Sequence, residues 1–168
     1  MLELLLLRHA KSDWGDPDLA DHDRDLAPRG LKAAPRMGRL LRRRGLVPDL
    51  VLCSTARRAR RTWELASAEL ASPPPVRHLR GLYLATPAQM LAAIRRQPPG
   101  RLLLVGHDPG MHHLAIQLAA EGEPEALGSL NEKFPTAALA WLQLDIAAWQ
   151  DVAPGRLAGF FRPRRPDD

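Results

Sequence analysis

The sequence has little cysteine, little lysine and few aromatic residues, and it lacks a long hydrophobic run. Its one cysteine, Cys53, excludes an internal disulfide and a structural zinc site built from several thiolates. The N-terminal apolar run, Leu2 to Leu7, is interrupted by Glu3 and is far shorter than a signal peptide or a membrane span requires. We therefore expect a cytoplasmic protein without a membrane partner.

Almost all of the positive charge of the chain comes from arginine. Its formal net charge is +5, and of its 24 basic residues only Lys11, Lys32 and Lys133 are lysine. A basic surface first points to nucleic acid as a partner. However, no run of basic residues is interleaved with aromatic residues, which make up only 5% of the chain. We therefore predict no nucleic-acid partner and ascribe the excess of arginine to an Arg-, Ala- and Pro-rich composition. Binding of a small anion by a few of the arginines stays open.

The length of the chain and the order of its hydrophobic segments favour one α/β domain. A chain of 168 residues is typical of a single domain, which we place at residues 1–162, followed by a polar tail at 163–168. Short apolar runs alternate with longer amphipathic ones, which predicts a mostly parallel sheet in a three-layer α/β/α sandwich. The predicted strands cover residues 2–7, 50–53, 76–79, 102–105, 137–144 and 157–161. The predicted helices cover residues 27–44, 56–70, 87–96 and 109–120.

Local signals refine two of these helices. Pro35 lies inside the first helix and is expected to kink it or to shift its start. Thr86 precedes Pro87 and is expected to cap the third helix, with the proline at the first helical position.

Charged residues follow three of the predicted strands, at the point where each strand ends. Arg8-His9 follows the first strand, Ser54-Thr55-Ala56-Arg57-Arg58 follows the second, and His107-Asp108-Pro109 follows the fourth. In an open parallel sheet, ligands bind beyond the carboxyl ends of the strands. If these strands are parallel neighbours, two histidines and at least two arginines converge on one crevice.

The second of these segments also opens a helix with many cations in its first turns. Ser54 is a good N-cap residue, and it places Arg57, Arg58, Arg60 and Arg61 where the helix dipole makes cations unfavourable. A bound anion reverses the sign of that interaction, because backbone N–H groups and arginines then act together. We expect at least one of the four arginines to bind an anion and the others to extend into solvent.

Two histidines and two arginines without a metal suit phosphoryl transfer. A neutral imidazole attacks phosphorus and forms a covalent phosphohistidine, while the planar guanidinium of arginine matches phosphate oxygens in a bidentate manner. A second histidine donates a further hydrogen bond. The set is chemically complete for a phosphatase without a metal or another cofactor.

Three sequence blocks, in this order, resemble the histidine phosphatase superfamily, in its phosphoglycerate mutase-like branch. Arg8-His9-Ala10-Lys11-Ser12 resembles the family's Arg-His-Gly signature, and Ser54 to Thr62 resembles its Ser-Pro-x-x-Arg-Ala-x-Gln-Thr segment. Val105-Gly106-His107-Asp108-Pro109-Gly110 resembles its Gly-His-Asn-Pro block. The short chain and the first block are most similar to the SixA-type phosphohistidine phosphatases. The resemblance spans roughly residues 2–145 and implies the phosphoglycerate mutase-like fold.

The resemblance implies roles for four residues. It makes His9 the nucleophile and places Arg8, Arg58 and His107 in the phosphate pocket. The implied activity is hydrolysis of phosphoryl groups, with a phosphorylated substrate, in particular a phosphohistidine-bearing protein, as partner. Four other positions depart from the family pattern without removing a charge from the pocket: Ala10, Thr55, Arg61 and Asp108 replace glycine, proline, glutamine and asparagine.

A larger departure concerns the proton donor. Many members of this branch carry a glutamate beyond the third strand, but the segment from Arg80 to Pro87 contains no carboxylate. Asp13, Asp16 and Asp18 in the first loop, and Asp108, remain as candidates. An alkoxide leaving group benefits greatly from a positioned acid, whereas an imidazole, with a pKa near 6.5, is protonated more readily. A site without a dedicated acid therefore favours P–N bonds or activated esters.

Other interpretations of the same residues are weaker. A cysteine-dependent phosphatase needs an arginine at a fixed spacing from its cysteine, and that spacing from Cys53 falls on Ala59. The adjacent His112 and His113 would point about 100° apart on a helix and have no carboxylate pair at ligand spacing. The chain also lacks a Gly-rich phosphate loop with its lysine. Two alternative functions stay open: a broad small-molecule phosphomonoesterase of the same family, and a non-catalytic phosphate- or anion-binding module.

Overall fold

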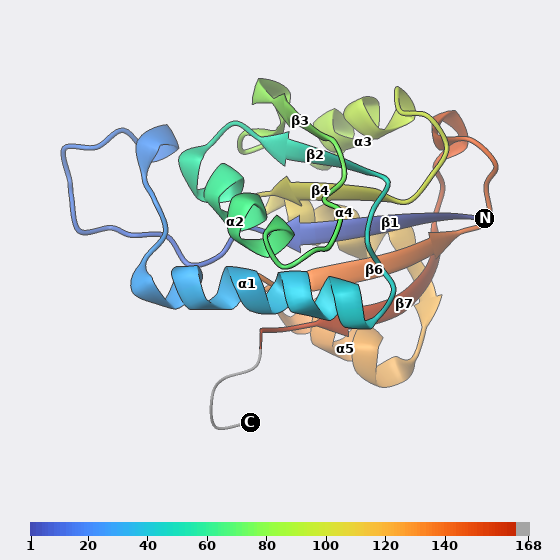
Figure 1. Cartoon of the computed structure of the whole chain (residues 1–168). Coiled ribbons are helices and arrows are strands. Elements are labelled where there is room, and N and C mark those ends of the chain that lie inside the picture. Colours follow the sequence, from blue (N-terminus) through green and yellow to red (C-terminus); the bar gives the residue numbers. More distant parts are fainter. Residues whose placement is uncertain (164–168) are drawn as a thin grey trace.

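Seven strands form one sheet in the computed structural model of the chain, which describes residues 1–163 (Figure 1). The strands are β1 (Leu2–Arg8), β2 (Leu50–Ser54), β3 (Val76–Leu79), β4 (Leu102–Gly106), β5 (Ala119–Gly122), β6 (Leu139–Leu144) and β7 (Gly155–Phe161). Their order in the sheet is β3-β2-β4-β1-β6-β7-β5. The first four strands of this order pair in parallel, and β6 pairs antiparallel with both β1 and β7.

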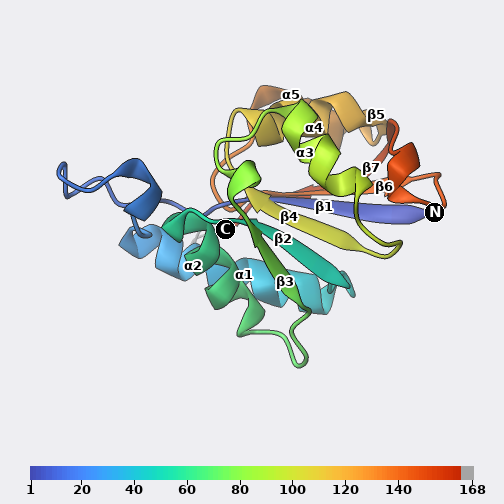
Figure 2. The same ribbon diagram turned by 90° about the horizontal axis from the view of Figure 1, so that it is seen from above.

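Helices cover both faces of the sheet (Figure 2). One face carries α1 (Pro28–Arg43) and α2 (Arg57–Ser67). The other face carries α3 (Pro87–Arg95), α4 (Gly110–Leu118) and α5 (Pro124–Glu132). Three 3₁₀ turns lie in the connections: η1 (Asp21–Asp23), η2 (Arg80–Leu82) and η3 (Trp149–Asp151). The predicted fold class, a three-layer α/β/α sandwich with a mostly parallel sheet, is confirmed.

The central strand β1 contributes to two separate hydrophobic cores. Leu4 and Leu6 pack with residues of α3, α4 and α5, whereas Leu5 and Leu7 pack with residues of α1 and α2. Side chains alternate between the two faces of a strand, and both faces are covered here. This double burial explains why the strand is a nearly continuous run of leucine rather than an alternating pattern.

The helix signals in the sequence are partly confirmed. Thr86 caps α3 through a capping box, in which its hydroxyl accepts the Gln89 N–H and the Gln89 side chain accepts the Thr86 N–H. Pro35 does not shift the start of α1, which begins at Pro28 and continues through Pro35 to Arg43. Pro28 sets this start because its fixed φ suits the first helical position.

Ser54 is not the N-cap of α2, contrary to the prediction. It is the last residue of β2 and is fully buried, and Ala56 is the residue that precedes the helix. The Ser54 hydroxyl accepts the Ala56 N–H at 3.2 Å, so it still satisfies a backbone donor near the helix start.

Two elements in the second half of the chain differ from the prediction. The helix expected over 109–120 ends at Leu118, and the chain then enters β5, which lies at the edge of the sheet. Helix α5 was not predicted, because it buries only Leu130 fully and therefore has a weak apolar stripe. The predicted tail at 163–168 lies, apart from Pro163, outside the described residues. Over residues 1–163, no helix is long and apolar enough to cross a membrane.

Candidate active site

The carboxyl ends of three adjacent strands bring the predicted site residues together. β4 lies between β1 and β2 and is parallel to both, as expected. Arg8 is level with Gly106 in this register, and the backbone N–H of His9 donates to the Gly106 carbonyl at 3.0 Å. The rings of His9 and His107 consequently lie 5.2 Å apart, centroid to centroid. The two imidazoles share one crevice at this edge of the sheet.

Arg58 enters the same crevice from the first turn of α2. Its side chain is buried, with only 3% of the residue exposed, and its guanidinium lies over the Tyr83 ring at 5.8 Å. Tyr83 in turn meets the His107 ring edge-on, with a centroid distance of 5.5 Å. The structure therefore gathers Arg8, His9, Arg58 and His107, which lie far apart in the sequence.

His9 is held as a neutral imidazole with a fixed tautomer. Its Nδ1 lies 2.7 Å from the Ala10 carbonyl, and because a carbonyl oxygen only accepts, Nδ1 carries the proton. Burial, together with the charges of Arg58 and Arg8, lowers the pKa of His9 to about 4. Nε2 is then unprotonated near neutral pH and retains its lone pair.

His107 is neutral for a similar reason and is oriented by a serine. Its Nε2 is hydrogen-bonded to the Ser54 hydroxyl at 2.7 Å, and both residues are buried. Burial, with the neighbouring His9 and Arg58, lowers the pKa of His107 to about 3. Sequence reasoning assigned Ser54 to a helix cap and missed this contact, which depends on the parallel pairing of β2 with β4.

Arg8 is held by one group after α5 and by one between β4 and α4. Its Nη1 donates to the Phe134 carbonyl at 2.8 Å and lies 3.7 Å from a carboxylate oxygen of Asp108. Burial lowers the pKa of Arg8, and the Asp108 charge opposes this effect. Asp108, one of the four candidate proton donors, thus faces an arginine.

Three of the four gathered residues carry buried nitrogen atoms without a hydrogen-bond partner within residues 1–163. These atoms are Nε of Arg8, Nε of Arg58 and Nδ1 of His107. An unpaired buried donor is costly, and an oxyanion accepts several N–H groups at once. The crevice therefore has the donor set of an anion site.

Asp21 is the main site residue that the sequence did not reveal. It lies in η1, and its Oδ2 accepts hydrogen bonds from Arg58 Nη2 at 2.9 Å and from the Tyr83 hydroxyl. Its Oδ1 accepts from Arg24 Nη2 at 2.9 Å. Although burial opposes it, these hydrogen bonds hold the pKa of Asp21 well below its usual range. Asp21 is therefore ionised and orients Arg58 rather than donating a proton.

Thr62 connects the loop after β1 to helix α2. Its hydroxyl donates to the Arg58 carbonyl at 2.7 Å and accepts the Ala10 N–H at 2.9 Å. These two bonds fix the position of His9 relative to Arg58, because they join the residue that follows His9 to the turn that carries Arg58. Close packing also holds the segment that follows His107, at the start of α4. A Cβ on Gly110 would lie 1.9 Å from the Ala85 carbonyl oxygen, so the backbone there approaches Ala85 closely.

The other candidate proton donors lie in the loop that precedes η1. Asp13 accepts the Gly15 N–H at 2.8 Å, and Asp16 accepts the Asp18 N–H at 3.0 Å, both at exposed positions. Within residues 1–163, no hydrogen bond or ion pair joins these three aspartates to His9. The side chains of Asp13 and Asp16 thus bond to the backbone of their own loop rather than to the crevice.

The remaining arginines of α2 and the single cysteine have other surroundings. Arg57 pairs with Asp25 at 3.1 Å and Arg61 with Glu64 at 3.0 Å, at exposed positions. Cys53 is buried inside the sheet, and burial raises the pKa of its thiol to about 12, so it is not a nucleophile at neutral pH.

The sequence of the chain is similar to those of known proteins. The family model of the histidine phosphatase superfamily (branch 1) matches residues 4–83, which include Arg8, His9 and Arg58. An uncharacterized protein of Mycobacterium tuberculosis is 43% identical over 164 residues, covering 94% of this chain and all of the relative. The chain belongs to the histidine phosphatase superfamily.

Two solved structures place this histidine phosphatase within its family. One is a SixA protein of Agrobacterium tumefaciens, proposed to be a phosphohistidine phosphatase, with 30% identity, a TM-score of 0.81 and coverage of 96% of this chain and 97% of the other. The other is a SixA protein of Nakamurella multipartitia, similarly assigned, with 29% identity, a TM-score of 0.80 and coverage of 96% and 95%. The predicted SixA-type family and the predicted enzyme class, a hydrolase acting on phosphoryl groups, are confirmed.

Proposed function

We propose that this histidine phosphatase hydrolyses phosphohistidine through a covalent intermediate on Nε2 of His9. The observation that carries the proposal is the tautomer of His9. Its Nδ1 proton is committed to the Ala10 carbonyl, which leaves the Nε2 lone pair as the reactive position. A pKa of about 4 keeps this nitrogen unprotonated at neutral pH.

In the first step, Nε2 of His9 attacks phosphorus and the P–N bond of the substrate breaks. The phosphoryl group moves as PO₃⁻ equivalent, and the substrate imidazole, which carries a proton on its other ring nitrogen, leaves as a neutral ring. One P–N bond is exchanged for another of the same kind, so no separate acid has to protonate the leaving group. The step therefore needs no proton from Asp21, which Tyr83, Arg58 and Arg24 hold in its ionised form.

The cations and the second histidine stabilise the transferring group. Arg8 and Arg58 lie close enough for their charges to act on His9, and we assign them to the equatorial oxygens of the phosphoryl group. We assign the Ser54 hydroxyl as donor to Nε2 of His107. The single proton of the neutral His107 ring then resides on Nδ1, which becomes a donor to the same group.

In the second step, water attacks phosphorus and the bond between phosphorus and Nε2 of His9 breaks. Both protons of the water molecule stay with the released phosphate, as H₂PO₄⁻, and His9 returns to its neutral state. The partner is a phosphorylated substrate, and the chemistry of the leaving group favours a phosphohistidine-bearing protein. SixA structures at about 30% identity support this choice of substrate.

The test compares phosphate release from a phosphohistidine peptide with release from a panel of sugar and alkyl phosphates. We expect the phosphohistidine peptide to be the better substrate in kcat/KM. We expect His9→Ala to abolish turnover and the acid-labile labelling of the enzyme by phosphorylated substrate. His113→Ala is the matched control, because His113 is exposed on α4 and should leave both signals unchanged.

Three outcomes would contradict the proposal in different ways. Turnover by His9→Ala at the normal rate removes His9 as nucleophile. Faster hydrolysis of sugar phosphates than of phosphohistidine makes the protein a broad phosphomonoesterase. Saturable phosphate binding without any phosphate release makes it an anion-binding module.

A further inference from the structure

Both terminal amino groups of Arg58 are bound by one residue, Asp21. Nη1 of Arg58 donates to the Asp21 backbone carbonyl at 2.7 Å, and Nη2 donates to Oδ2 of the Asp21 carboxylate at 2.9 Å. Nε of Arg58 is buried and has no hydrogen-bond partner within residues 1–163. Because the guanidinium is planar and its N–H groups point in fixed directions, these two bonds set the rotation of the whole group. The edge formed by Nε and the second N–H of Nη2 remains for a ligand.

The carboxylate that holds Arg58 is itself only partly buried. The Asp21 side chain is 43% exposed, compared with 4% for the side chain of Arg58. An exposed side chain changes rotamer within nanoseconds unless other groups restrain it. Two further donors restrain this one: the Tyr83 hydroxyl donates to Oδ2, the oxygen that also binds Arg58, and Arg24 Nη2 donates to Oδ1 at 2.9 Å.

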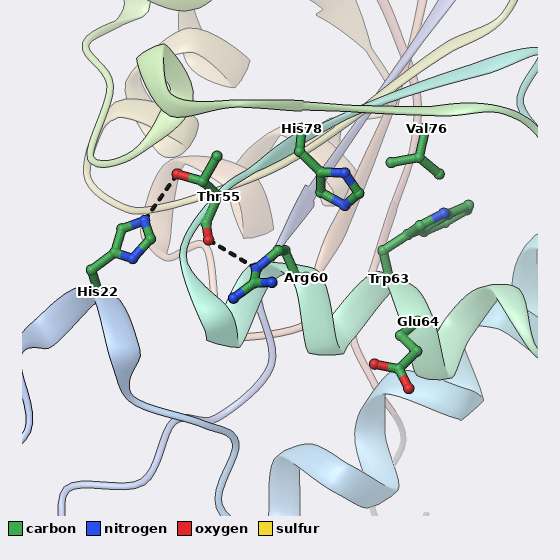
Figure 3. Close-up of a pocket in the computed structure, with 7 residues that line it drawn as sticks. All are labelled: His22, Thr55, Arg60, Trp63, Glu64, Val76 and His78. Carbon is green, nitrogen blue, oxygen red and sulfur yellow. Dashed lines mark hydrogen bonds between the residues drawn. The ribbon is translucent and has the colours of Figure 1, made fainter.

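The turn η1, which carries Asp21, is fixed to the segment that opens α2. Nε2 of His22 is hydrogen-bonded to the Thr55 hydroxyl at 2.9 Å, which joins η1 to the residues that follow β2 (Figure 3). The His22 ring also meets the Tyr83 ring edge-on, at 4.8 Å between centroids. Tyr83 therefore contacts η1 at two places, the carboxylate of Asp21 and the ring of His22.

Tyr83 contacts the crevice as well as η1. Its ring meets the His107 ring edge-on at 5.5 Å, and the Arg58 guanidinium lies over it at 5.8 Å. Burial lowers the pKa of both His9 and His107, and the charge of Arg58 adds to the effect in each case, so the guanidinium lies near both imidazoles. Because the Tyr83 hydroxyl donates to Asp21, it is suited to orient that carboxylate rather than to protonate a leaving group.

We propose that Tyr83 is a positioning residue for phosphoryl transfer, which acts through Asp21 on Arg58. Its hydroxyl holds the Asp21 carboxylate in the rotamer that binds the end of the guanidinium, so that the Nε edge of Arg58 meets the equatorial oxygens of the phosphoryl group. This role rests on the proposed function, which assigns Arg58 to those oxygens. A loosened Arg58 lowers kcat more than it raises KM, because preorganised donors act mainly on the charge of the transition state.

The first test is a double-mutant cycle on phosphate release from a phosphohistidine peptide. Tyr83→Phe should lower kcat about tenfold and change KM by less than about twofold. In an Arg58→Lys background, which keeps the charge but not the planar fork, the same substitution should change kcat by less than about twofold. A merely structural role of Tyr83 would lower kcat equally in both backgrounds.

The same cycle is repeated by calorimetric titration with orthovanadate, which adopts the trigonal-bipyramidal geometry of phosphoryl transfer. Tyr83→Phe should weaken vanadate binding about tenfold in the wild-type background and by less than about twofold in Arg58→Lys. This measurement needs no turnover. Turnover by His9→Ala or a preference for sugar phosphates would therefore contradict the proposed function alone, and the vanadate cycle would still decide the role of Tyr83.

A spectroscopic test uses the fact that Tyr83 is the only tyrosine of the chain. A sample labelled with [ζ-¹³C]tyrosine gives one NMR signal, which reports the ionisation of this hydroxyl directly. Burial and the hydrogen bond to Asp21 raise the pKa of Tyr83 above its ordinary value of 10. Asp21→Asn should lower this pKa, because it removes the neighbouring negative charge. Asp23→Asn is the matched control: it removes an exposed carboxylate from the same turn and should leave the pKa unchanged.

Three results would overturn the proposal. The first is a wild-type kcat and vanadate affinity in Tyr83→Phe. The second is an equal effect of this substitution in both backgrounds, which would mean that Tyr83 acts independently of Arg58. The third is a tyrosine pKa that Asp21→Asn does not change, which would mean that the hydroxyl and the carboxylate do not interact.

Discussion

At the scale of single residues, the crevice depends on hydrogen bonds that fix ring orientation as much as on the charged groups themselves. The contact between Ser54 and His107 is the clearest case, since it holds one imidazole nitrogen and leaves the other for a ligand. Ser54→Ala should therefore lower kcat by about tenfold to a hundredfold, because an unpartnered His107 Nε2 costs roughly 1–3 kcal/mol and the ring is free to turn. Initial rates of phosphate release check this expectation.

Ser67→Ala provides the control for this change. Ser67 is the last residue of α2 and half-buried, and its hydroxyl donates to the Glu64 carbonyl at 3.2 Å rather than to a residue of the crevice. It should leave kcat unchanged. If Ser54→Ala keeps the wild-type kcat while its unfolding midpoint falls, the serine is structural and does not orient His107 for catalysis.

The same scale shows what sequence reasoning finds and what it misses. Arg8, His9 and His107 directly follow apolar strands, and Arg58 opens a helix, so their convergence follows from the rule that parallel strands end at one edge. Asp21 follows no strand and sits in a 3₁₀ turn of a long loop. Its hydrogen bond to Arg58 depends on the path of that loop, which local sequence propensity does not determine.

At the scale of elements, the position of Arg58 depends on how closely α1 and α2 approach. Gly38 of α1 makes this approach possible, because a Cβ there would lie 2.0 Å from the Ala66 carbonyl oxygen of α2. Gly38→Ala should destabilise the protein by about 2 kcal/mol, since overpacking costs typically 1–3 kcal/mol and outweighs the gain in helix propensity. Chemical denaturation measures the change in the free energy of unfolding.

Gly128 gives the matched comparison for Gly38. It also lies inside a helix, α5, but a Cβ there meets nothing within 4 Å. Gly128→Ala should stabilise the protein by about 0.5–1 kcal/mol through helix propensity alone. Equal effects of the two substitutions would show that the α1–α2 distance is not set by Gly38.

A helix or strand could be predicted where it buries enough apolar side chains to leave a hydrophobic pattern in the sequence. Strands β1, β2 and β4 are buried on both faces and read as continuous apolar runs. β5 and α5 lie at the far edge of the sheet and bury few side chains completely. With little apolar surface to bury, neither leaves a clear period in the sequence.

At the scale of the whole molecule, the crevice makes stability depend on pH. Burial lowers the pKa of His9 to about 4 and that of His107 to about 3, against 6.5 for an ordinary histidine. Above pH 6.5 both rings are neutral in the folded and the unfolded chain. As the pH falls from 6.5, the unfolded chain takes up protons that the folded crevice rejects, so stability is lost progressively down to the folded pKa values.

The free energy of unfolding should therefore fall by roughly 1.5 kcal/mol for each histidine between pH 6.5 and pH 5, with a slope that rises toward about 1.4 kcal/mol per pH unit as the unfolded histidine becomes fully protonated. Denaturant unfolding at a series of pH values measures this slope. His107→Gln should remove about half of it, since one of the two rings no longer titrates, while the exposed His113→Gln should leave it unchanged. A slope that survives both His9→Gln and His107→Gln would mean that other groups set the acid response. The neutrality on which the proposed role of His9 as nucleophile depends and the expected acid sensitivity of the fold have one cause, the removal of both imidazoles from water.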